Sequence, residues 1–542
     1  MITGNKIIHW AKLISICIVM IAFIASCTKN FDKFNTNQNE ATEAMLATDN
    51  LKTGAFFAQM QRNVVLFKDG TNLSSDYQVA QGLTSDLYSG FVAPTGAWYP
   101  NGVHNGSYYF ITGWIEKTFT SGFASEMPAW QSITKIAADQ KLPQVAAMAT
   151  IVKVEAMHRV ADAYGPIPYN NYGSGTLQNM YSTQQDVYTK FFTELDSAIT
   201  VLTNFVQANP ATTLLADFDY IYKGNVANWI KFANTLRLRL AMRVVYANAA
   251  LAQTEAEKST SNPFGLISSV NDRAALQHSA NLTYYHPLYE IAYSFNAGEA
   301  RMSASMDVFM NGYADPRRAS YFTKADDGNY HGVRQGITAN TWTPYTGTKI
   351  SSFNMNTSTT QIVWITAAES YFLRAEGALR GWNMGGLASD FYNQGIAASF
   401  VENGLQASDA AIYAANNTLV PAAFTDNSGQ SGNNATAPST IKIAWTATDP
   451  FETNLERIIT QKWLAIYPDG PEGWAEFRRT GYPKLLPVVT NNSNGTINTA
   501  VQVRRIPFPL SEYNNNKVGV QSGIAALGGP DGGGTKVWWD KK

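Results

Sequence analysis

The sequence predicts a mostly α-helical protein, in which pairs of helices form a scaffold that loop-rich segments interrupt. Apolar residues recur every three or four positions between about 143 and 244 and again between about 368 and 477, the spacing of one buried helix face. Three segments, about 70–122, 259–360 and 407–446, lack this spacing and are rich in glycine and polar residues. Such segments are typical of loops, so we interpret them as insertions in a helical scaffold.

The first half of the chain contains helix start and stop signals between these apolar stripes. A helix is plausible over 51–63. Pro143 opens a clear helix, because proline is accepted in the first helical turn, and Gly165-Pro166 ends it. Ser182, with Gln185 three residues later, has the capping-box pattern that starts the next helix. The apolar stripes are Ile151, Val154, Met157 and Ala161; Tyr188, Phe191, Leu195, Ile199 and Leu202; and Trp229, Phe232, Leu236, Leu240 and Val244.

Helical pairing resumes at Ala368, and Gly385-Gly386 separates two partner helices. In the second of these, Ala388 and Tyr392 resemble the second-helix signature of a tetratricopeptide repeat, where a small residue allows close helix contact. The tail after Pro483 is rich in Asn and Gly and is expected to be coil. The stripes are Ala368, Tyr371, Ala375, Ala378 and Trp382; Ala388, Tyr392, Ile396 and Phe400; and Leu455, Ile459, Trp463 and Ile466, followed by Trp474 and Phe477.

The N-terminus has the pattern of an export signal. Lys6 and Lys12 precede an uncharged apolar run over 13–25, which is shorter than the roughly 20 residues of a spanning helix. The run ends in Ile24-Ala25-Ser26-Cys27, which resembles a bacterial lipobox; the alternative is an ordinary signal peptide with a chance cysteine. We therefore predict a signal peptide over 1–26, lipidation of Cys27, a tether over 27–48 and a single domain over 49–542.

Composition excludes several classes of function. The net charge is −1 and no basic block occurs, which argues against a nucleic-acid partner. No later apolar run approaches the roughly 18 residues of a transmembrane segment, so the lipid is the expected membrane contact. Cys17 leaves with the signal, so only Cys27 remains and a disulfide framework is excluded. Charged residues make up 15% and aromatic residues 12%, a surface chemistry that suits neutral sugars.

Catalytic signatures are absent from the sequence. It contains no His-Glu-x-x-His, Gly-x-Ser-x-Gly or Cys-x-x-Cys motif and no phosphate-binding loop, and its six histidines lack metal-ligand spacing. The pairs Asp217 with Asp219 and Asp326 with Asp327 could bind calcium or act as glycosidase acids, but such chemistry depends on spatial separation. We therefore predict no enzyme, no catalytic residue, no metal and no cofactor, with structural calcium left open.

Several segments resemble the SusD/RagB family of nutrient-binding outer-membrane lipoproteins from Bacteroidetes, and within it the second SusD-like branch. The strongest is Gln-Lys-Trp-Leu-Ala-Ile-Tyr-Pro at 461–468, followed by Glu-Gly-Trp-Ala-Glu-Phe-Arg-Arg-Thr-Gly-Tyr-Pro at 472–483. Further matching segments occur at 162–169, 229–239, 368–382 and 504–509 with Glu512. These segments span nearly the whole chain after the lipobox, and together they are specific.

The resemblance implies a SusD-like fold, with four tetratricopeptide-like helix pairs as the scaffold and insertions as the ligand face. It implies a partner, a SusC-like TonB-dependent outer-membrane transporter, and ligands that are usually glycans and sometimes peptides. It also implies a lipid-anchored protein at the outer membrane, which we expect to face the cell exterior.

Aromatic residues fall into two groups with different expected roles. Trp229, Trp382, Trp463 and Trp474 lie on helix stripes and are expected to pack the core. Arg237, Arg239, Arg478 and Arg479 are expected to form structural ion pairs or interhelix hydrogen bonds. Loop aromatics are better placed for a ligand, because functional residues concentrate on loops carried by a rigid scaffold; otherwise they plug the loops onto the scaffold. The predicted ligand-binding residues are Trp98, Tyr99, Tyr108, Tyr284, Trp342 and Tyr345.

Three functions are compatible with these observations. The first is a binding protein that captures a nutrient, expected to be an oligosaccharide, and hands it to a transporter. The second is a lipid-anchored surface glycoside hydrolase, which would need two carboxylates within about 10 Å in an aromatic cleft. The third is a helical-repeat assembly scaffold without a small ligand. The absence of a catalytic constellation favours the first.

Overall fold

A computed structural model describes residues 51–67, 76–176, 178–293, 299–337, 339, 342–355 and 360–542. The predicted signal peptide, the tether and Cys27 lie outside the described residues. Residues Thr53–Lys542 form one compact unit. No helix among the described residues is long and apolar enough to span a membrane.

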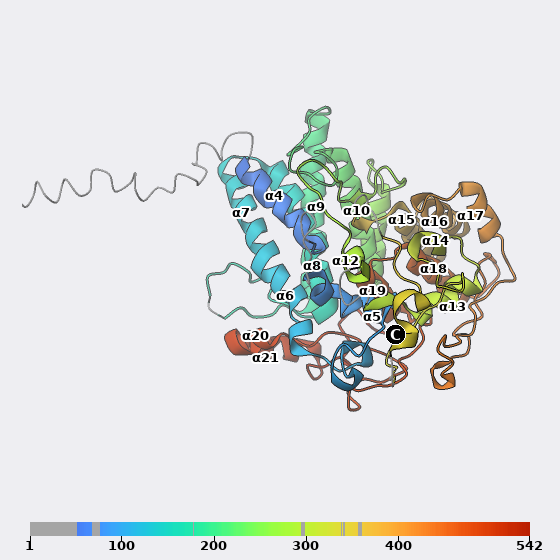
Figure 1. Cartoon of the computed structure of the whole chain (residues 1–542). Coiled ribbons are helices and arrows are strands. Elements are labelled where there is room, and N and C mark those ends of the chain that lie inside the picture. The colour runs from blue at the N-terminus through green and yellow to red at the C-terminus, as the bar shows by residue number, and fades with distance from the viewer. Residues whose placement is uncertain are drawn as a thin grey trace, which may run out of the picture. The chain divides into compact units, whose positions relative to one another are not determined.

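The unit is mostly helical, which confirms the predicted fold class (Figure 1). Short helices lie mainly in the segments between the long ones. The longer helices are α4 (Leu51–Val64), α7 (Met127–Asp139), α8 (Pro143–Tyr164), α9 (Gln184–Ala208), α10 (Val226–Arg243), α11 (Ala249–Ser261), α15 (Ala367–Leu379), α16 (Ala388–Glu402), α18 (Phe451–Ala465), α19 (Gly470–Thr480) and α21 (Lys517–Leu527). The shorter ones are α5 (Ser85–Tyr88), α6 (Lys117–Ser121), α12 (Pro287–Tyr293), α13 (Ala304–Gly312), α14 (Arg318–Tyr321), α17 (Ala407–Ala414) and α20 (Leu510–Asn515).

Consecutive long helices pack against each other. Helix α8 contacts α7 and α9, α10 contacts α9 and α11, and α15 contacts α16 and α18. In Figure 1, α7, α8 and α9 stand side by side, and α10 leads across to the group of α15, α16 and α18. The contact between α10 and α15 therefore joins the two helical groups into one scaffold.

Local signals place the helix ends close to where the sequence predicts them. Pro143 is the first residue of α8, and Gly165, with φ 84°, ends it. The start of α9 corrects the capping-box prediction: Thr183, rather than Ser182, is the N-cap, and its hydroxyl accepts from the backbone N–H of Asp186. An extended threonine with an acceptor oxygen caps the helix as well as serine would.

Several helices were missed by the sequence prediction. Helices α7 and α11 lie between the predicted stripes, and α17 occupies the start of the segment predicted as a polar insertion. The tail after Pro483, expected as coil, contains α20 and α21. Helix α21 is rich in Gly, Ala and Val, and Val520 is its fully buried residue. Tertiary packing stabilises such segments where intrinsic helix propensity is weak.

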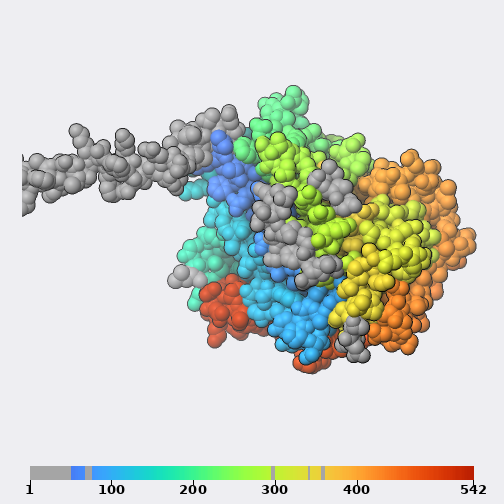
Figure 2. Space-filling model, viewed as in Figure 1, coloured from blue at the N-terminus to red at the C-terminus, as the bar shows by residue number. Residues whose placement is uncertain are grey.

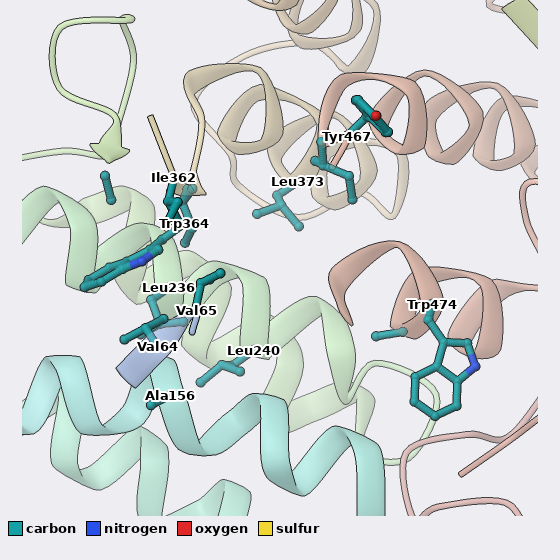
Figure 3. Close-up of a cluster of buried hydrophobic side chains, with 14 of the residues drawn as sticks. Val64, Val65, Ala156, Leu236, Leu240, Ile362, Trp364, Leu373, Tyr467 and Trp474 are labelled. Atoms are coloured by element: carbon teal, nitrogen blue, oxygen red, sulfur yellow. The ribbon is translucent and has the colours of Figure 1, made fainter. Parts of the chain in front are cut away.

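The stripe aromatics lie in the core, as predicted. Trp229 and Trp463 are fully buried, Trp474 is buried, and Trp382 packs partly buried against the same core. Figure 3 shows how side chains from distant segments meet there: Val64 and Val65 at the end of α4, Leu236 and Leu240 on α10, and Leu373 on α15. The helices thus share one continuous apolar core.

A network of buried ion pairs runs between the same helices. On α8, Glu155 accepts from Arg159 at 2.8 Å, and Arg159 also donates to Asp469 at 2.9 Å. Arg239 on α10 donates to Glu369 on α15 at 2.6 Å. Burial alone would raise the pKa of Glu155, but the positive charges of Arg159 and Arg239 lower it to about 2. The predicted structural role of Arg239 is confirmed.

The network continues towards the C-terminal helices. Arg243 donates to Asp162 at 2.7 Å and also to Glu472 on α19. Lys462 on α18 donates to the other oxygen of Glu472 at 2.8 Å. Arg479 donates to Glu376 and to Glu476, each at 2.6 Å. Arg478 donates to the backbone carbonyl of Asp162. Arg237 pairs with Asp196. Buried charges persist only when paired, so these contacts fix the relative positions of α8, α10, α15, α18 and α19.

Two small strand pairs lie at the base of the loop-rich segments. Strand β1 (Val92–Pro94) pairs antiparallel with β3 (Ala300–Met302), with Ala93 opposite Arg301. Strand β2 (Ala274–Ala275) pairs antiparallel with β4 (Val363–Ile365). The first pair brings the segments predicted as the first and second insertions together.

Candidate functional site

The chain after β1 forms a loop of short turns that carries several aromatic side chains. It contains three 3₁₀ turns, η3 (Pro100–Gly102), η4 (Asn105–Ser107) and η5 (Thr112–Trp114). Trp98 (φ 45°), Asn101 (φ 61°) and Tyr108 (φ 67°) adopt the left-handed conformation, three of the nine non-glycine residues that do so in the described part of the chain. Each such residue costs on the order of 1–3 kcal/mol, and strain of this kind concentrates at functional sites.

Hydrogen bonds hold this loop in place. The indole N–H of Trp98 donates to the carbonyl of Glu299 at 3.0 Å, and the backbone N–H of Thr95 donates to the same carbonyl at 2.8 Å. Asn105 donates to the carbonyl of Leu83 at 2.9 Å and accepts from the backbone N–H of Ile111 at 2.9 Å. The aromatic side chains therefore sit on a rigid support.

Trp98, Tyr99 and Trp114 form an aromatic group on this loop. Trp114 lies edge-on to both others, with ring centroids 6.4 Å from Trp98 and 6.2 Å from Tyr99. Tyr99 is 46% exposed, Trp98 and Trp114 are half-buried, and nearby Tyr109 is 44% exposed. Figure 2 shows the segment near residue 100, in light blue, at the surface of the molecule. Exposed rings held at right angles offer a stacking surface to a ligand.

Three tyrosines form a row: Tyr285 lies just before α12, and Tyr289 and Tyr293 lie on it. Tyr285 and Tyr289 stack with centroids 4.6 Å apart, and Tyr289 and Tyr293 follow at 4.8 Å. Tyr293 is 45% exposed. The positive charge of Arg301 acts on the Tyr293 hydroxyl, which places the row near the β1–β3 pair. We had not predicted these three residues as ligand contacts, although their four-residue spacing is visible in the sequence.

The titratable groups next to the aromatic loop favour a neutral ligand. Burial lowers the pKa of His104 to about 4, and its Nδ1 accepts from the backbone N–H of Gly106 at 3.0 Å, so the imidazole is neutral at physiological pH. His104 is 3% exposed and packs against the Trp98 ring with ring centroids 5.1 Å apart. The groups that this loop presents to a ligand include aromatic rings and phenol hydroxyls, which bind by stacking and hydrogen bonding.

The structure brings two of the predicted ligand residues together and separates a third. Trp98 and Tyr99 are neighbours in the aromatic loop. Trp342 is half-buried and packs 5.8 Å from Tyr345, against a small apolar cluster that includes Ala93 of β1. Trp342 therefore packs in a cluster apart from the Trp98 ring group.

The other three predicted residues are enclosed by protein. Tyr108 is 3% exposed. Tyr284 is 2% exposed, and its hydroxyl donates to the carbonyl of Leu276 and accepts from the N–H of Ile362. Tyr345 is 1% exposed and donates to Asp426. The buried rings of these three residues offer no stacking face. The hydrogen bonds of Tyr284 and Tyr345 fasten loops to the scaffold, which favours the alternative interpretation for those two.

The acidic pairs singled out in the sequence have structural partners. Asp219 accepts from the backbone N–H groups of Ile221 and Gly224 and from the Trp229 indole, which closes the turn before α10. Asp327 accepts from His331 at 2.7 Å. Among the described residues there is no group of three or more His, Cys, Asp or Glu side chains that could hold a metal ion.

The comparisons with known proteins match this geometry. The family model "SusD-like: Susd and RagB outer membrane lipoprotein" matches residues 33–540. The chain belongs to this family. A chitin-binding SusD homolog from Flavobacterium johnsoniae is 41% identical, with TM-score 0.85, 90% of this chain covered and 99% of that chain. SusD homologs from Bacteroides uniformis (35% identical, TM-score 0.83, covering 91% and 100%) and Bacteroides vulgatus (34%, 0.84, 91% and 98%) are also similar. None of the curated proteins compared with the chain matches it.

The family match confirms the resemblance and places the chain among outer-membrane lipoproteins. The similar protein from Flavobacterium johnsoniae is described as chitin-binding, and the family points to binding without catalysis. The aromatic loop and the tyrosine row are therefore best interpreted as a binding surface.

Proposed function

We propose that this SusD-like lipoprotein captures a neutral oligosaccharide on the surface formed by Trp98, Tyr99, Trp114 and the row Tyr285, Tyr289 and Tyr293. The observation that carries the proposal is the exposure of Tyr99 and Tyr293 (46% and 45%) on supports fixed to the same strand pair. Sugar rings present C–H faces for stacking and hydroxyls for hydrogen bonds. A surface with little formal charge suits such ligands better than charged ones.

The proposed ligand class is an oligomer of N-acetylglucosamine. The similar protein from Flavobacterium johnsoniae is described as chitin-binding, and the aromatic surface here is compatible with a chain of neutral acetamido sugars. Several rings along one surface favour an oligomer, because each sugar unit adds one stacking contact.

We also propose where the protein is anchored and which partner receives the sugar. Lipid on Cys27 would tether the protein to the outer membrane, with the domain facing the cell exterior. The captured sugar would pass to a SusC-like TonB-dependent transporter, the partner that the family resemblance implies. Copurification of a transporter with the full-length lipoprotein, solubilised in mild detergent, tests this partnership, and its consistent absence would contradict it.

Calorimetry on the soluble protein that starts just after Cys27 tests ligand capture. We expect hexa-N-acetylchitohexaose to bind, and Trp114→Ala to weaken binding by tenfold or more, equivalent to about 1.4 kcal/mol. Phe451→Ala is the matched control, because Phe451 is an exposed aromatic (37%) on the helical scaffold at the start of α18. Equal losses in both variants, or binding of peptides but of no glycan, would contradict the proposal.

A further inference from the structure

A cavity of about 370 Å³ lies inside the compact unit, apart from the aromatic loop. Its walls come from β4, the N-terminal end of α15, the C-terminal end of α16, the turn between α18 and α19, and His286 before α12. Ligand pockets for small molecules range from about 300 to 1,000 Å³. The cavity therefore has the size of a site for a small ligand.

Most charged groups in its wall already have protein partners. Arg159 pairs with Asp469 at 2.9 Å, and Glu369 accepts from Arg239 at 2.6 Å. These three wall residues belong to the buried ion network of the scaffold. Arg273 and Glu402 remain as the two charged wall groups with spare hydrogen-bonding capacity.

Arg273 and Glu402 act on each other without forming an ion pair. Arg273 donates through one Nη to the side-chain oxygen of Gln361 at 2.7 Å. Glu402 uses one oxygen, Oε1, to accept from the backbone N–H groups of Ala367 and Ala368 at 2.8 and 3.3 Å. The positive charge of Arg273 counteracts the burial that raises the pKa of Glu402 to about 7. The second carboxyl oxygen and the remaining guanidinium N–H groups are left for a ligand.

His286 supplies a neutral donor. Its Nδ1 accepts from the backbone N–H of Leu288 at 3.2 Å, which places the ring proton on Nε2. Burial lowers the pKa of His286 to about 3, so the ring keeps this tautomer at physiological pH. His286 lines the cavity, whereas the tyrosine row that starts at Tyr285 does not.

Two asparagines complete the polar wall with acceptors. The amide N–H of Asn354 donates to the carbonyl of Ala319 at 2.8 Å, and that of Asn403 donates to the carbonyl of Ser399 at 2.8 Å. Both amides line the cavity, and their side-chain oxygens remain available to accept. The wall therefore offers both hydrogen-bond donors and hydrogen-bond acceptors to a ligand.

We propose that this cavity binds one neutral sugar unit, held between Arg273 and Glu402 and oriented by His286. Sugar hydroxyls both donate and accept, which matches a wall that offers both kinds of group. A ligand with net charge would be attracted by one of Arg273 and Glu402 and repelled by the other. The proposal rests on the cavity alone and does not require the aromatic loop to bind glycan.

Calorimetry and ligand-observed NMR with five monosaccharides test the proposal: glucose, galactose, mannose, xylose and N-acetylglucosamine, with glycine as a zwitterionic comparison. We expect at least one sugar to bind. Arg273→Met keeps the apolar stem but removes the donors, and should weaken binding about tenfold or more, the usual loss for a hydrogen bond to a charged group. Glu402→Gln keeps the acceptor for the α15 backbone and should weaken binding by a smaller factor.

Matched variants separate this site from the proposed surface site. Phe451→Ala, an exposed ring outside both sites, should leave monosaccharide affinity unchanged. Arg273→Met should lower monosaccharide affinity and leave the Trp114-dependent part of hexasaccharide binding in place. A crystal soaked with the bound sugar should show it beside Arg273, which keeps the test decisive if either cavity variant lowers the unfolding temperature. The proposal is overturned if no sugar of the panel binds, if glycine binds instead, or if bound sugar is insensitive to both cavity variants.

Discussion

The helical scaffold and the aromatic loop use opposite means to fix their side chains. In the scaffold, charges are buried and paired: Arg239 is fully buried, and it meets Glu369 at 2.6 Å. In the loop, the exposed side chains include uncharged rings such as Tyr99, and neutral hydrogen bonds to backbone carbonyls provide the support. The scaffold is thus specified by long-range pairing, and the loop by local turns fixed at a few points.

This difference indicates how the molecule divides its tasks. A buried charge that loses its partner is strongly destabilising, so changes in the network should act on stability. An exposed ring has little packing to lose, so changes in the loop should act on ligand affinity. Variants in the two regions should therefore separate stability from binding.

Arg239→Met should lower the stability of the fold more than any other proposed variant, and it should leave ligand affinity unchanged. The change leaves Glu155 and Glu369 buried with fewer positive partners, and breaking such a pair costs about 3–5 kcal/mol. Urea unfolding followed by circular dichroism measures this loss as a lower midpoint.

Arg237→Met on the same helix is the matched control. Arg237 is buried but pairs at 3.0 Å with Asp196, whose side chain is 41% exposed. Its removal leaves a carboxylate that water can solvate, so the loss should be smaller than in Arg239→Met. Equal losses in the two variants would show that the buried network has no special weight, and the contrast with the loop would fail.

Acid should weaken the scaffold before it affects the loop. Arginine partners hold the pKa of Glu155 and of Glu376 at about 2, against an ordinary value of 4.5. A carboxyl whose pKa is lower in the folded than in the unfolded protein stabilises the fold at any pH above the unfolded value. This stabilisation is lost as the pH falls from about 4.5 through about 2. Each of the two contributes on the order of 3 kcal/mol.

The measurement is the urea midpoint between pH 7 and pH 2. We expect a plateau near neutral pH and a steep fall below about pH 4.5, reduced in Glu376→Gln, which no longer titrates at that position. A midpoint that stays constant down to pH 3 would contradict the assigned role of these carboxyls.

The sequence predicted the scaffold better than the loops for a physical reason. Stripe residues such as Trp229 and Trp463 repeat at helical spacing, so their burial follows from local pattern. Tyr345 has no such pattern: its partner Asp426 lies far along the chain, and only the fold brings them together. Loop aromatics look alike in sequence whether they face solvent, as Tyr99 does, or protein, as Tyr284 does. The four-residue spacing of the tyrosine row is visible in the sequence, but spacing alone does not show which face of the row is exposed.

Tyr293→Ala should lower affinity without a large change in stability. Its ring is 45% exposed and stacks on Tyr289 at 4.8 Å, so the variant removes an exposed end of the row. We expect hexa-N-acetylchitohexaose affinity to fall about threefold to tenfold, or roughly 0.6–1.4 kcal/mol, with the urea midpoint nearly unchanged. Calorimetry on the variant gives the affinity; a lower midpoint with unaltered affinity would assign Tyr293 to the fold instead.

Tyr345→Phe should have the smallest effect, and it tests the boundary between the two regions most closely. The Tyr345 hydroxyl donates to Asp426 at 3.1 Å and accepts from Asn433 at 3.1 Å, so it fastens the 343–349 turns to the 426–433 segment. Losing it should cost about 1 kcal/mol of stability and leave glycan affinity unchanged, because the ring is enclosed. Urea unfolding and calorimetry on the same preparation measure both quantities. Lost affinity at unchanged stability would place Tyr345 among the ligand contacts, as its position in the sequence first predicted, and would move the binding surface towards Trp342.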